Sequence, residues 1–589
     1  MLKFYRDLRL EIKRRKAALE ALVIGQFGAG FVTDEMLKSD GIKEVVGGHS
    51  TQISQLGADK EDASNKIAVI DAASTDAQYP SGKAVYNAVY GLAYGKHYTA
   101  RWDKVNAQMS RLNDATDITT TTTNFGHFGS LNPSYDNPFD SIYPWSGITL
   151  CNIDIDLYLT YLANGGDATD CVTAFLGDPS FSYTDDNGVW RYTPEFWGRD
   201  TDDGTYRYFD ICDKEYPGHN HYRAKIGGRW WGQTATRTIG GSSKVVLLPK
   251  VGMPAKDITM STLHTYAKNM SATLDNIYTI DGDTLLFLVE FATMNSQTAL
   301  GRGVDDLYSQ SGHKIQENAS TSATVKVLTS RAANCIANAI FNIGSSDGGS
   351  QVGSYIISAT EVDTDPTKTI IVLTTDGSTP ASVTATTSNF WSIHGLANVA
   401  DTDIGKASGY IGANGKSNAY YRGTAFHANL FRYVLGVYRQ TGTGAIWIAA
   451  DEVAADALNT AAHIDTGLVL STTSNYIQTL GAKTGLSCAP FCTAVGGSSA
   501  NPVGDFCYVP TLATGNTILL LGGNANDGVG SGRFYSNWNN SAANSHWSIG
   551  AFPLLKNPLG GRKGSQLPCS VILAFKYSSP CFGSSSTRR

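Results

Sequence analysis

The sequence predicts an α+β fold in which short strands and turns predominate. Gly, Ser, Thr and Asn are abundant, with 61 glycines in 589 residues, whereas charged residues make up only 17%. Glycine and asparagine favour turns and threonine favours strands, so this composition indicates many short strands rather than a charged helical protein. Two segments with helical patterns, residues 259–270 and 283–300, supply the α part of the fold. The second segment is apolar on most sides, which predicts a buried helix.

Bulk properties limit the classes of partner. A chain of this length is expected to hold about two to four domains. The net charge of −6 argues against nucleic acid as the main partner, because phosphate binding needs a basic surface. No apolar run approaches the ~18 residues of a spanning helix, so we expect no membrane insertion. The N-terminus is basic and no apolar stretch follows it, which does not fit a secretory signal.

The cysteines are interpreted as buried free thiols. Nine are present, an odd number, and they are scattered along the chain. Only Cys488 and Cys492 lie close together, and no second pair follows at the spacing of a zinc site. We therefore expect neither a metal site nor a cofactor.

Residues 1–30 are expected to form a docking segment. Apolar residues on 3-4 spacing predict one helix over residues 1–24, which is ended by glycines. A single helix of this length is marginal in water, so docking to a partner or to sister chains is favoured over lying on a membrane. Residues 31–140 look like linkers and a small helical, turn-rich module, in which Ser81 could cap a short helix.

The main domain is expected to begin at residue 141, where aromatic residues and short apolar runs become dense. Within it, residues 190–211 form two strand patterns around an Asp-Gly turn, which predicts a hairpin. Residues 305–400 are rich in Thr and Gly and predict a small β insertion that divides the domain into residues 141–304 and 401–582. The strands expected in the insertion are residues 325–328, 353–357 and 369–374.

Four landmarks of this domain resemble the C-type-lectin-like (formylglycine-generating-enzyme-like) domains of phage tail proteins. They are the hairpin at residues 193–218, LLFLVEFATMNSQTALGRG at 285–303, YRGTAF at 421–426, and the Gly- and Asn-rich residues 519–550. In addition, STDAQYPSGKAVY at residues 74–86 is similar to a segment that joins modules in phage tail fibres. The resemblance implies a C-type-lectin-like fold, a place in the virion, host adhesion and trimeric assembly.

The last landmark is also similar to the variable region of proteins diversified by a retroelement. Such systems mutate template adenines and so replace Asn codons. Four residues stand where the family pattern shows Asn and are reachable from its codons, namely Asp527, Gly530, His546 and Ser548. Trp538 and Trp547 are not reachable by adenine changes alone, so the diversification mechanism stays open.

Residues 522–551 are the candidate recognition surface, because aromatic residues and arginine are favoured at binding hot spots and asparagine shapes irregular loops. We expect a scaffold made of Gly522, Gly523, Gly528, Gly532, Phe534, Asn539, Asn540, Ile549 and Gly550. We expect the ligand-binding side chains to be Ala525, Asp527, Val529, Gly530, Ser531, Arg533, Tyr535, Trp538, Ala543, His546, Trp547 and Ser548. The plain alternative is an ordinary surface loop with two half-buried tryptophans.

Enzymatic interpretations have less support, and we expect no catalytic residues. An acidic cluster on the 190–211 hairpin suits calcium or a glycosidase, but Asp is favoured there by turn chemistry alone. Its members are Asp200, Asp202, Asp203 and Asp210. His219 and His221 have no further ligand nearby in the sequence, which is a weak metal signature. Cys488 and Cys492 match no motif of the formylglycine-generating enzymes, and the calcium-binding triplets of sugar-binding lectins are absent.

Together with the composition of residues 522–551, the resemblance therefore implies a bacteriophage tail receptor-binding protein, which we expect to have no enzymatic activity. It is expected to recognise a host surface protein or glycan, to dock on other virion tail proteins through its N-terminus, and to form a homotrimer. Three alternatives remain: a structural tail or baseplate protein without receptor contact, a glycan-degrading tailspike enzyme, and a cellular surface lectin diversified in the same way.

Overall fold

The computed structural model divides the chain into two units, with the boundary between Lys96 and His97. It describes residues 95–119, 137–301, 313–346, 351–398, 419–510 and 515–556, except positions 165, 167, 428, 459 and 484–485. In the first unit it describes only the parallel pair β1 (Lys66–Ile67) and β2 (Tyr79–Pro80). The helix expected over residues 1–24, the helix near Ser81 and the last part of the expected domain, residues 557–582, lie outside the described residues.

The second unit begins with a five-stranded sheet in the order β10-β8-β9-β3-β4. Its strands are β3 (His97–Asp103), β4 (Gln108–Asn113), β8 (Phe196–Asp202), β9 (Tyr206–Cys212) and β10 (Asn220–Tyr222). Strands β8 and β9 pair antiparallel, which confirms the expected hairpin. The domain start expected at residue 141 differs from the structure, because β3 pairs with β9 along its whole length. Tyr98, Ala100 and Trp102 alternate into the core and fix β3 there.

A six-stranded sheet brings distant parts of the chain together in the order β14-β33-β11-β7-β5-β6. Its strands are β5 (Thr149–Ile153), β6 (Val172–Phe175), β7 (Trp190–Thr193), β11 (Lys225–Gly228), β14 (Ala272–Leu274) and β33 (Pro553–Leu555). Helix α4 (Ile155–Ala163) follows β5, and β12 (Gln233–Ile239) and β13 (Ser242–Leu248) form a separate hairpin.

A nine-stranded sheet carries the candidate recognition segment. Its order is β26-β25-β24-β30-β31-β29-β27-β28, with β32 beside β24. Its strands are β24 (Phe431–Gln440), β25 (Ala445–Ala449), β26 (His463–Val469), β27 (Asn475–Lys483), β28 (Leu486–Val495), β29 (Phe506–Tyr508), β30 (Asn516–Leu521), β31 (Ser536–Asn537) and β32 (Ile549–Gly550). The hairpin β22 (Ala419–Tyr421) and β23 (Thr424–His427) precedes it, and α9 (Glu452–Asp456) follows β25.

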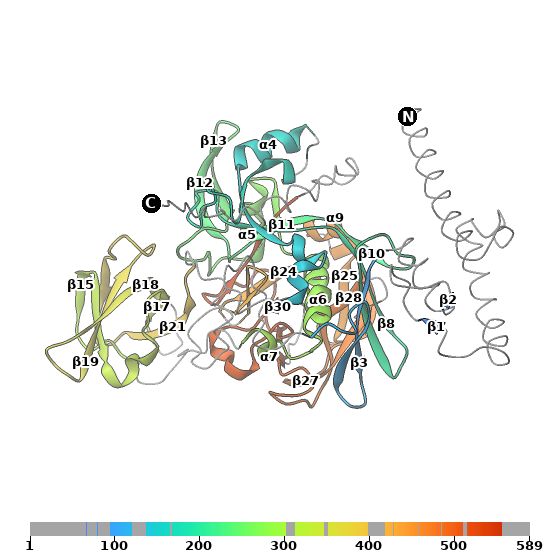
Figure 1. Ribbon diagram of the computed structural model, residues 1–589. Helices are drawn as coiled ribbons and strands as arrows, with labels where there is room; N and C mark the ends of the chain where they lie inside the picture. Colours follow the sequence, from blue (N-terminus) through green and yellow to red (C-terminus); the bar gives the residue numbers. More distant parts are fainter. Residues whose placement is uncertain are drawn as a thin grey trace, which may run out of the picture. The chain divides into compact units, whose positions relative to one another are not determined.

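Helix α6 (Ile277–Phe291) lies at the centre of the unit, in contact with β3, β8 and β9 of one sheet and with β24 and β28 of another (Figure 1). Helix α5 (Met260–Lys268) confirms the first expected helix. The second expected helix, residues 283–300, is two helices, because Ala292 adopts the left-handed conformation and Asn295 caps α7 (Ser296–Leu300). No helix in the described part of the chain is long and apolar enough to cross a membrane.

The expected β insertion is present with a core of its own. Its main sheet has the order β16-β19-β18-β17-β21, and β15 pairs with β20. Its strands are β15 (Ala319–Ser322), β16 (Thr324–Leu328), β17 (Ala339–Gly344), β18 (Gln351–Val362), β19 (Lys368–Thr374), β20 (Val383–Ala385) and β21 (Phe390–Leu396). Val327, Phe341 and Ile371 are among the wholly buried residues of this core. The described chain is thus mostly sheet with a few helices, which agrees with the coarse α+β prediction.

A buried ion pair connects two of the sequence landmarks. The carboxylate of Glu290 on α6 accepts hydrogen bonds from Nε and Nη2 of Arg422 at 2.8 and 2.6 Å. The Tyr421 hydroxyl donates to it at 2.9 Å and the Asn137 amide at 2.7 Å. Glu290 is 0% exposed and Arg422 2%. Buried charges persist only when they are paired in this way, so the pair fixes the 421–423 turn against α6.

Replacing Arg422 by Met should lower the free energy of unfolding by about 3–5 kcal/mol, because the buried Glu290 carboxylate would lose its cation. Urea unfolding followed by tryptophan fluorescence measures this effect. Lys104→Met is the matched control, since Lys104 pairs with Asp202 near the surface and its loss should cost less than about 1 kcal/mol. Equal losses in the two variants would contradict a central role for the Glu290–Arg422 pair.

Candidate recognition site

The candidate segment, residues 522–551, starts where β30 ends and is shaped by glycines. Gly522 and Gly523 have φ values of 93° and 71°, a conformation that favours glycine. A Cβ on Gly532 would lie 2.0 Å from the Asp505 carboxylate, and one on Gly523 would lie 2.5 Å from the Ser531 hydroxyl. These contacts confirm the glycines as scaffold. The scaffold prediction also holds for Phe534 and Ile549, which are buried.

The prediction that Arg533 presents its side chain to a ligand is wrong. Arg533 is 4% exposed, and its guanidinium donates to the Thr284 hydroxyl of α6 at 3.0 and 2.7 Å and to the Ile280 carbonyl at 3.2 Å. Burial lowers the pKa of Arg533 to about 9. The side chain thus anchors the segment to the central helix.

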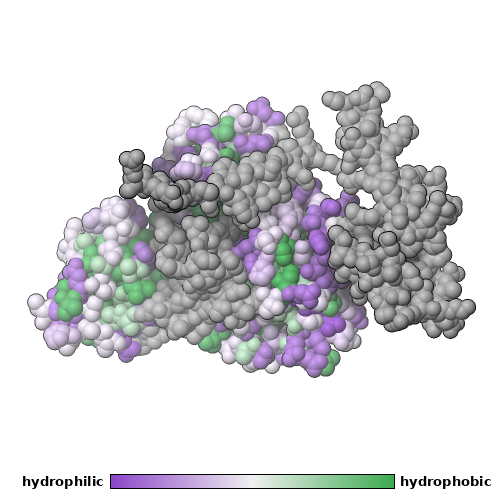
Figure 2. Space-filling model, viewed as in Figure 1, coloured by the Kyte–Doolittle hydropathy of each residue, from purple (hydrophilic) through white to green (hydrophobic). Residues whose placement is uncertain are grey.

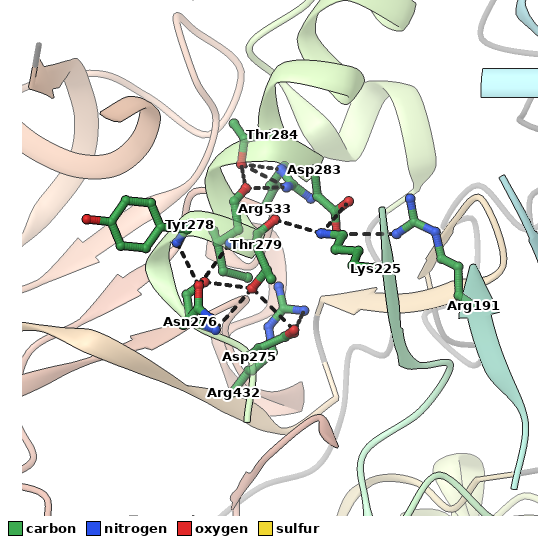
Figure 3. A network of polar contacts seen from close by, with 11 residues as sticks. Arg191, Lys225, Asp275, Asn276, Tyr278, Thr279, Asp283, Thr284, Arg432 and Arg533 are labelled. Atoms are coloured by element: carbon green, nitrogen blue, oxygen red, sulfur yellow. Dashed lines mark hydrogen bonds and ion pairs between the residues drawn. The ribbon is translucent and has the colours of Figure 1, made fainter. Parts of the chain in front are cut away.

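Figure 3 shows Arg533 within a larger buried polar network around α6. Arg191 and Lys225 converge on Asp283, with nitrogen–oxygen distances of 3.3 and 3.1 Å. Nearby, Arg432 pairs with Asp275 at 3.1 Å. The two cations, with Arg533 nearby, lower the pKa of Asp283 although burial raises it. Both carboxylates of this network thus have a cationic partner within the protein.

Other predicted binding side chains are also buried, which corrects the expected surface. The members in question are Gly530, Ser531, Tyr535, Trp538, Trp547 and Ser548. Tyr535 donates its hydroxyl to Asp527 at 2.8 Å, and Trp538 is 0% exposed in the main core. The reason is physical, since large aromatic side chains gain most by burial when the chain offers a core for them. The alternative, an ordinary surface loop with two half-buried tryptophans, is also wrong about these side chains, because Trp538 and Trp547 are both buried.

Some predicted positions do remain at the surface. Val529 is 44% exposed, Ala543 is exposed, and Asp527 and His546 are half-buried. The burial of the Ala525 side chain is not described. Asn539, which was assigned to the scaffold, is exposed, and Asn540 is half-buried. The accessible part of the segment is therefore smaller than expected and includes both apolar and polar residues.

A groove borders this segment and is formed by three parts of the chain. It has a volume of about 430 Å³. Its walls come from the start of β12, from the loop before α5, and from the start of β18 in the insertion. Its lining residues are Gln233, Thr234, Met253, Pro254, Ala255, Lys256, Asp257, Ile258, Gln351, Val352, Gly353 and Ser354. The backbone N–H of Asp257 donates to the His546 carbonyl at 3.1 Å, which joins the groove to the candidate segment.

Three side chains that line the groove converge on Asn342 of β17, which is not itself a lining residue. Its amide oxygen accepts from Lys256 Nζ at 3.1 Å, from Gln351 Nε2 at 2.6 Å and from the Ser354 hydroxyl at 2.6 Å. Burial lowers the pKa of Lys256 to about 7, with Asp257 opposing the shift. These hydrogen bonds fix the groove's polar groups relative to one another, a feature of preorganised binding sites.

A smaller cavity lies where Trp547 meets the insertion. The rings of His394 and Trp547 approach with centroids 3.4 Å apart, and His394 Nε2 and the Ser392 hydroxyl are 2.5 Å apart. The cavity has a volume of about 20 Å³, which suits a single water molecule and no larger ligand. Trp547 therefore seals the junction between the insertion and the rest of the unit.

The four aspartates of the 190–211 hairpin do not form one site. Asp200 pairs with Arg207 at 2.5 Å in a buried contact, while Asp203 accepts backbone hydrogen bonds of the turn from Thr205 and Tyr206. Asp202 pairs with Lys104, and Asp210 with Arg199. The turn chemistry expected for this cluster accounts for Asp203, and ion pairs engage the others.

The cysteine prediction is confirmed for the residues that can be assessed. Six cysteines are free and buried, namely Cys151, Cys171, Cys212, Cys335, Cys492 and Cys507. The side chain of Cys488, and the segment with Cys569 and Cys581, are not described.

The groove residues were missed by the sequence analysis. No local spacing connects Lys256 with Gln351, or with Asn342, to which both donate hydrogen bonds, because Lys256 belongs to a segment far from the other two in the chain. Comparison of the sequence with known protein families and with curated proteins found no match.

Two carboxyl groups of this region, Asp505 and Asp527, have raised pKa values. Burial raises the pKa of Asp505 to about 7 and that of Asp527 to about 6, against hydrogen bonds that lower both. Asp505 accepts the Phe534 backbone N–H at 2.7 Å, so it holds the middle of the candidate segment. At pH values between the ordinary pKa and the raised one, the folded chain keeps a proton that the unfolded chain loses.

The Asp505 contribution to stability should therefore be full at low pH and be lost as the pH rises through about 7, by at most about 1.4 kcal/mol per pH unit. Asp505→Asn carries no titrating group, so the difference in free energy of unfolding between wild type and variant should change by this slope. Urea unfolding between about pH 5 and about pH 8 measures it. Asp203→Asn, in the exposed turn, should leave the slope in this range unaltered. A parallel pH dependence of wild type and Asp505→Asn would contradict the assignment.

Proposed function

We propose that this chain is a bacteriophage tail receptor-binding protein whose recognition surface is the groove beside residues 543–546. In this proposal, the second unit is a C-type-lectin-like domain, and host adhesion is its task in the virion. The observation that carries the proposal is the position of the groove, beside the junction between the candidate segment and the β insertion. The landmark segment that resembles variable regions meets the insertion there, next to an open groove with fixed polar groups.

The composition of the groove suits recognition of a polar surface ligand. Lys256, Asp257 and Gln351 offer charged and amide groups, while Met253 and Val352 offer apolar contact. Binding sites typically combine apolar walls with a few placed polar groups. Val352 is 54% exposed at the start of β18, where Figure 2 shows hydrophobic and hydrophilic residues interspersed over the insertion.

A binding role is favoured over glycan cleavage by the groove's ionisable groups. Glycosidases commonly use two carboxyl groups across the scissile bond. Among the described lining residues, Asp257 is the only carboxylate. Docking through the N-terminal segment and assembly as a homotrimer remain parts of the proposal, and several copies of a modest site would raise the apparent affinity by about 10²–10⁴.

Particles that carry Val352→Arg should adsorb to the host at least about tenfold more slowly than wild type, because the bulky cation would obstruct the groove. The measurement is the rate of loss of free particles in mixtures with host cells. Val362→Arg is the matched control, since Val362 is 90% exposed at the other end of the same strand. That variant should adsorb normally.

The results of these experiments would distinguish receptor binding by the groove from a structural role and from an enzymatic role. Normal adsorption of Val352→Arg particles would contradict the groove as the recognition surface. Failure of particle assembly in both variants would favour the structural tail or baseplate role. Release of soluble sugars from host glycans by the purified chain would favour the tailspike enzyme.

A further inference from the structure

Three side chains that can bind metal converge at one end of strands β3 and β9 in the five-stranded sheet. His97 begins β3, Cys212 ends β9, and His219 lies in the loop before β10. Their ligand atoms all lie within 4.8 Å of one another. The antiparallel register places His97 directly opposite Cys212, and the loop returns His219 to the same point. Nitrogen and sulfur donors thus meet although more than a hundred residues separate the first from the others.

The cluster is partly exposed at His97 and buried elsewhere, and one nitrogen of each imidazole lacks a hydrogen bond among the described residues. The side chain of His219 is 0% exposed, and Cys212 is 0% exposed. Nε2 of His219 and Nε2 of His97 are buried without a hydrogen-bond partner among the described residues. Buried polar groups are nearly always satisfied in folded proteins, so two such nitrogens beside a thiol call for an explanation. A bound cation would provide one.

The carboxylate of Asp210, which also pairs with Arg199 at 3.1 Å, lies beside both imidazoles. Oδ1 of Asp210 lies 3.4 Å from Nε2 of His97, and its Oδ2 lies 3.9 Å from Nε2 of His219. Asp210 precedes Cys212 by two residues on β9, so both side chains point to the same face of the sheet. Such a carboxylate commonly supports metal-binding histidines and favours a cation at the site.

We propose that His97, Cys212 and His219 bind a zinc ion. Imidazole nitrogen and thiolate sulfur are the ligands that zinc takes in proteins, and three of them leave one position for water or a carboxylate oxygen. On binding, the Cys212 thiol forms a sulfur–zinc bond and releases its proton to solvent.

The ion would act as a cross-link at the start of the second unit. His97 is the first residue of that unit, and the metal would join it to β9 and to the loop before β10. Metal binding to the folded chain stabilises it by mass action. The site would therefore hold together the start of β3, the end of β9 and the loop before β10.

Cobalt(II) titration of the metal-stripped, reduced full-length chain tests the proposal. We expect about one equivalent to bind, with the thiolate-to-cobalt charge-transfer absorption and strong visible bands of a tetrahedral site. Cys212→Ser should abolish the charge-transfer absorption. His219→Gln should weaken binding by at least about 10–100-fold, the loss that even a supporting residue of a metal site causes.

The matched control is His221→Gln. His221 lies two residues further on, is exposed and pairs with Glu195. This variant should bind cobalt and show the zinc-induced rise in melting temperature like wild type, whereas Cys212→Ser should show no rise. Circular dichroism establishes that each variant is folded. Absence of cobalt binding by wild type, or an unchanged charge-transfer band in Cys212→Ser, would overturn the proposal.

Discussion

The carboxylate of Glu290 is the constraint on which the rest of the second unit depends. It lies wholly inside the protein on α6. Its partners are Asn137, which precedes β5, and Tyr421 and Arg422 of the 421–423 turn. A buried carboxylate without these partners would carry a large desolvation penalty, so the three segments must meet for the helix to be buried. The same helix offers Asp283 and Thr284 to Arg191, Lys225 and Arg533. Charge pairing thus fixes how the sheets close around α6, and apolar packing fills the space between.

The elements that were predicted correctly are those whose pattern is formed by residues close together in the sequence. The 190–211 hairpin, helix α5 and the three expected strands of the insertion were found because alternation and turn residues lie side by side in the sequence. Strand β3 was missed although Tyr98, Ala100 and Trp102 alternate, because one short alternating run beside polar linkers carries little weight. The break at Ala292 was missed because a left-handed residue in an apolar run leaves no sequence signal.

The candidate surface was predicted less well, because the burial of its side chains depends on hydrogen-bond partners elsewhere in the chain. A Gly- and Asn-rich segment has the composition of an exposed loop, yet Arg533 and Tyr535 are buried because Thr284 and Asp527 receive their polar ends. Thr284 lies far away in the sequence, so the pairing could not be inferred from spacing. The scaffold glycines were predicted correctly because close backbone approach demands glycine wherever the partner comes from. The groove could not be predicted, since its walls depend on where the insertion docks.

The burial of this segment limits how a recognition surface here could vary. Replacing a side chain such as Arg533 or Trp538 removes a hydrogen bond or leaves a cavity in the core, and either change costs a large part of the stability of an ordinary domain. Substitutions at Val529, Ala543 or His546 carry no such cost, because these positions are at or near the surface. On the proposed function, diversity is therefore confined to a few positions in the segment, and their small area cannot form a whole interface. The remaining contact must come from fixed residues nearby, and the groove wall formed by the insertion is adjacent to them.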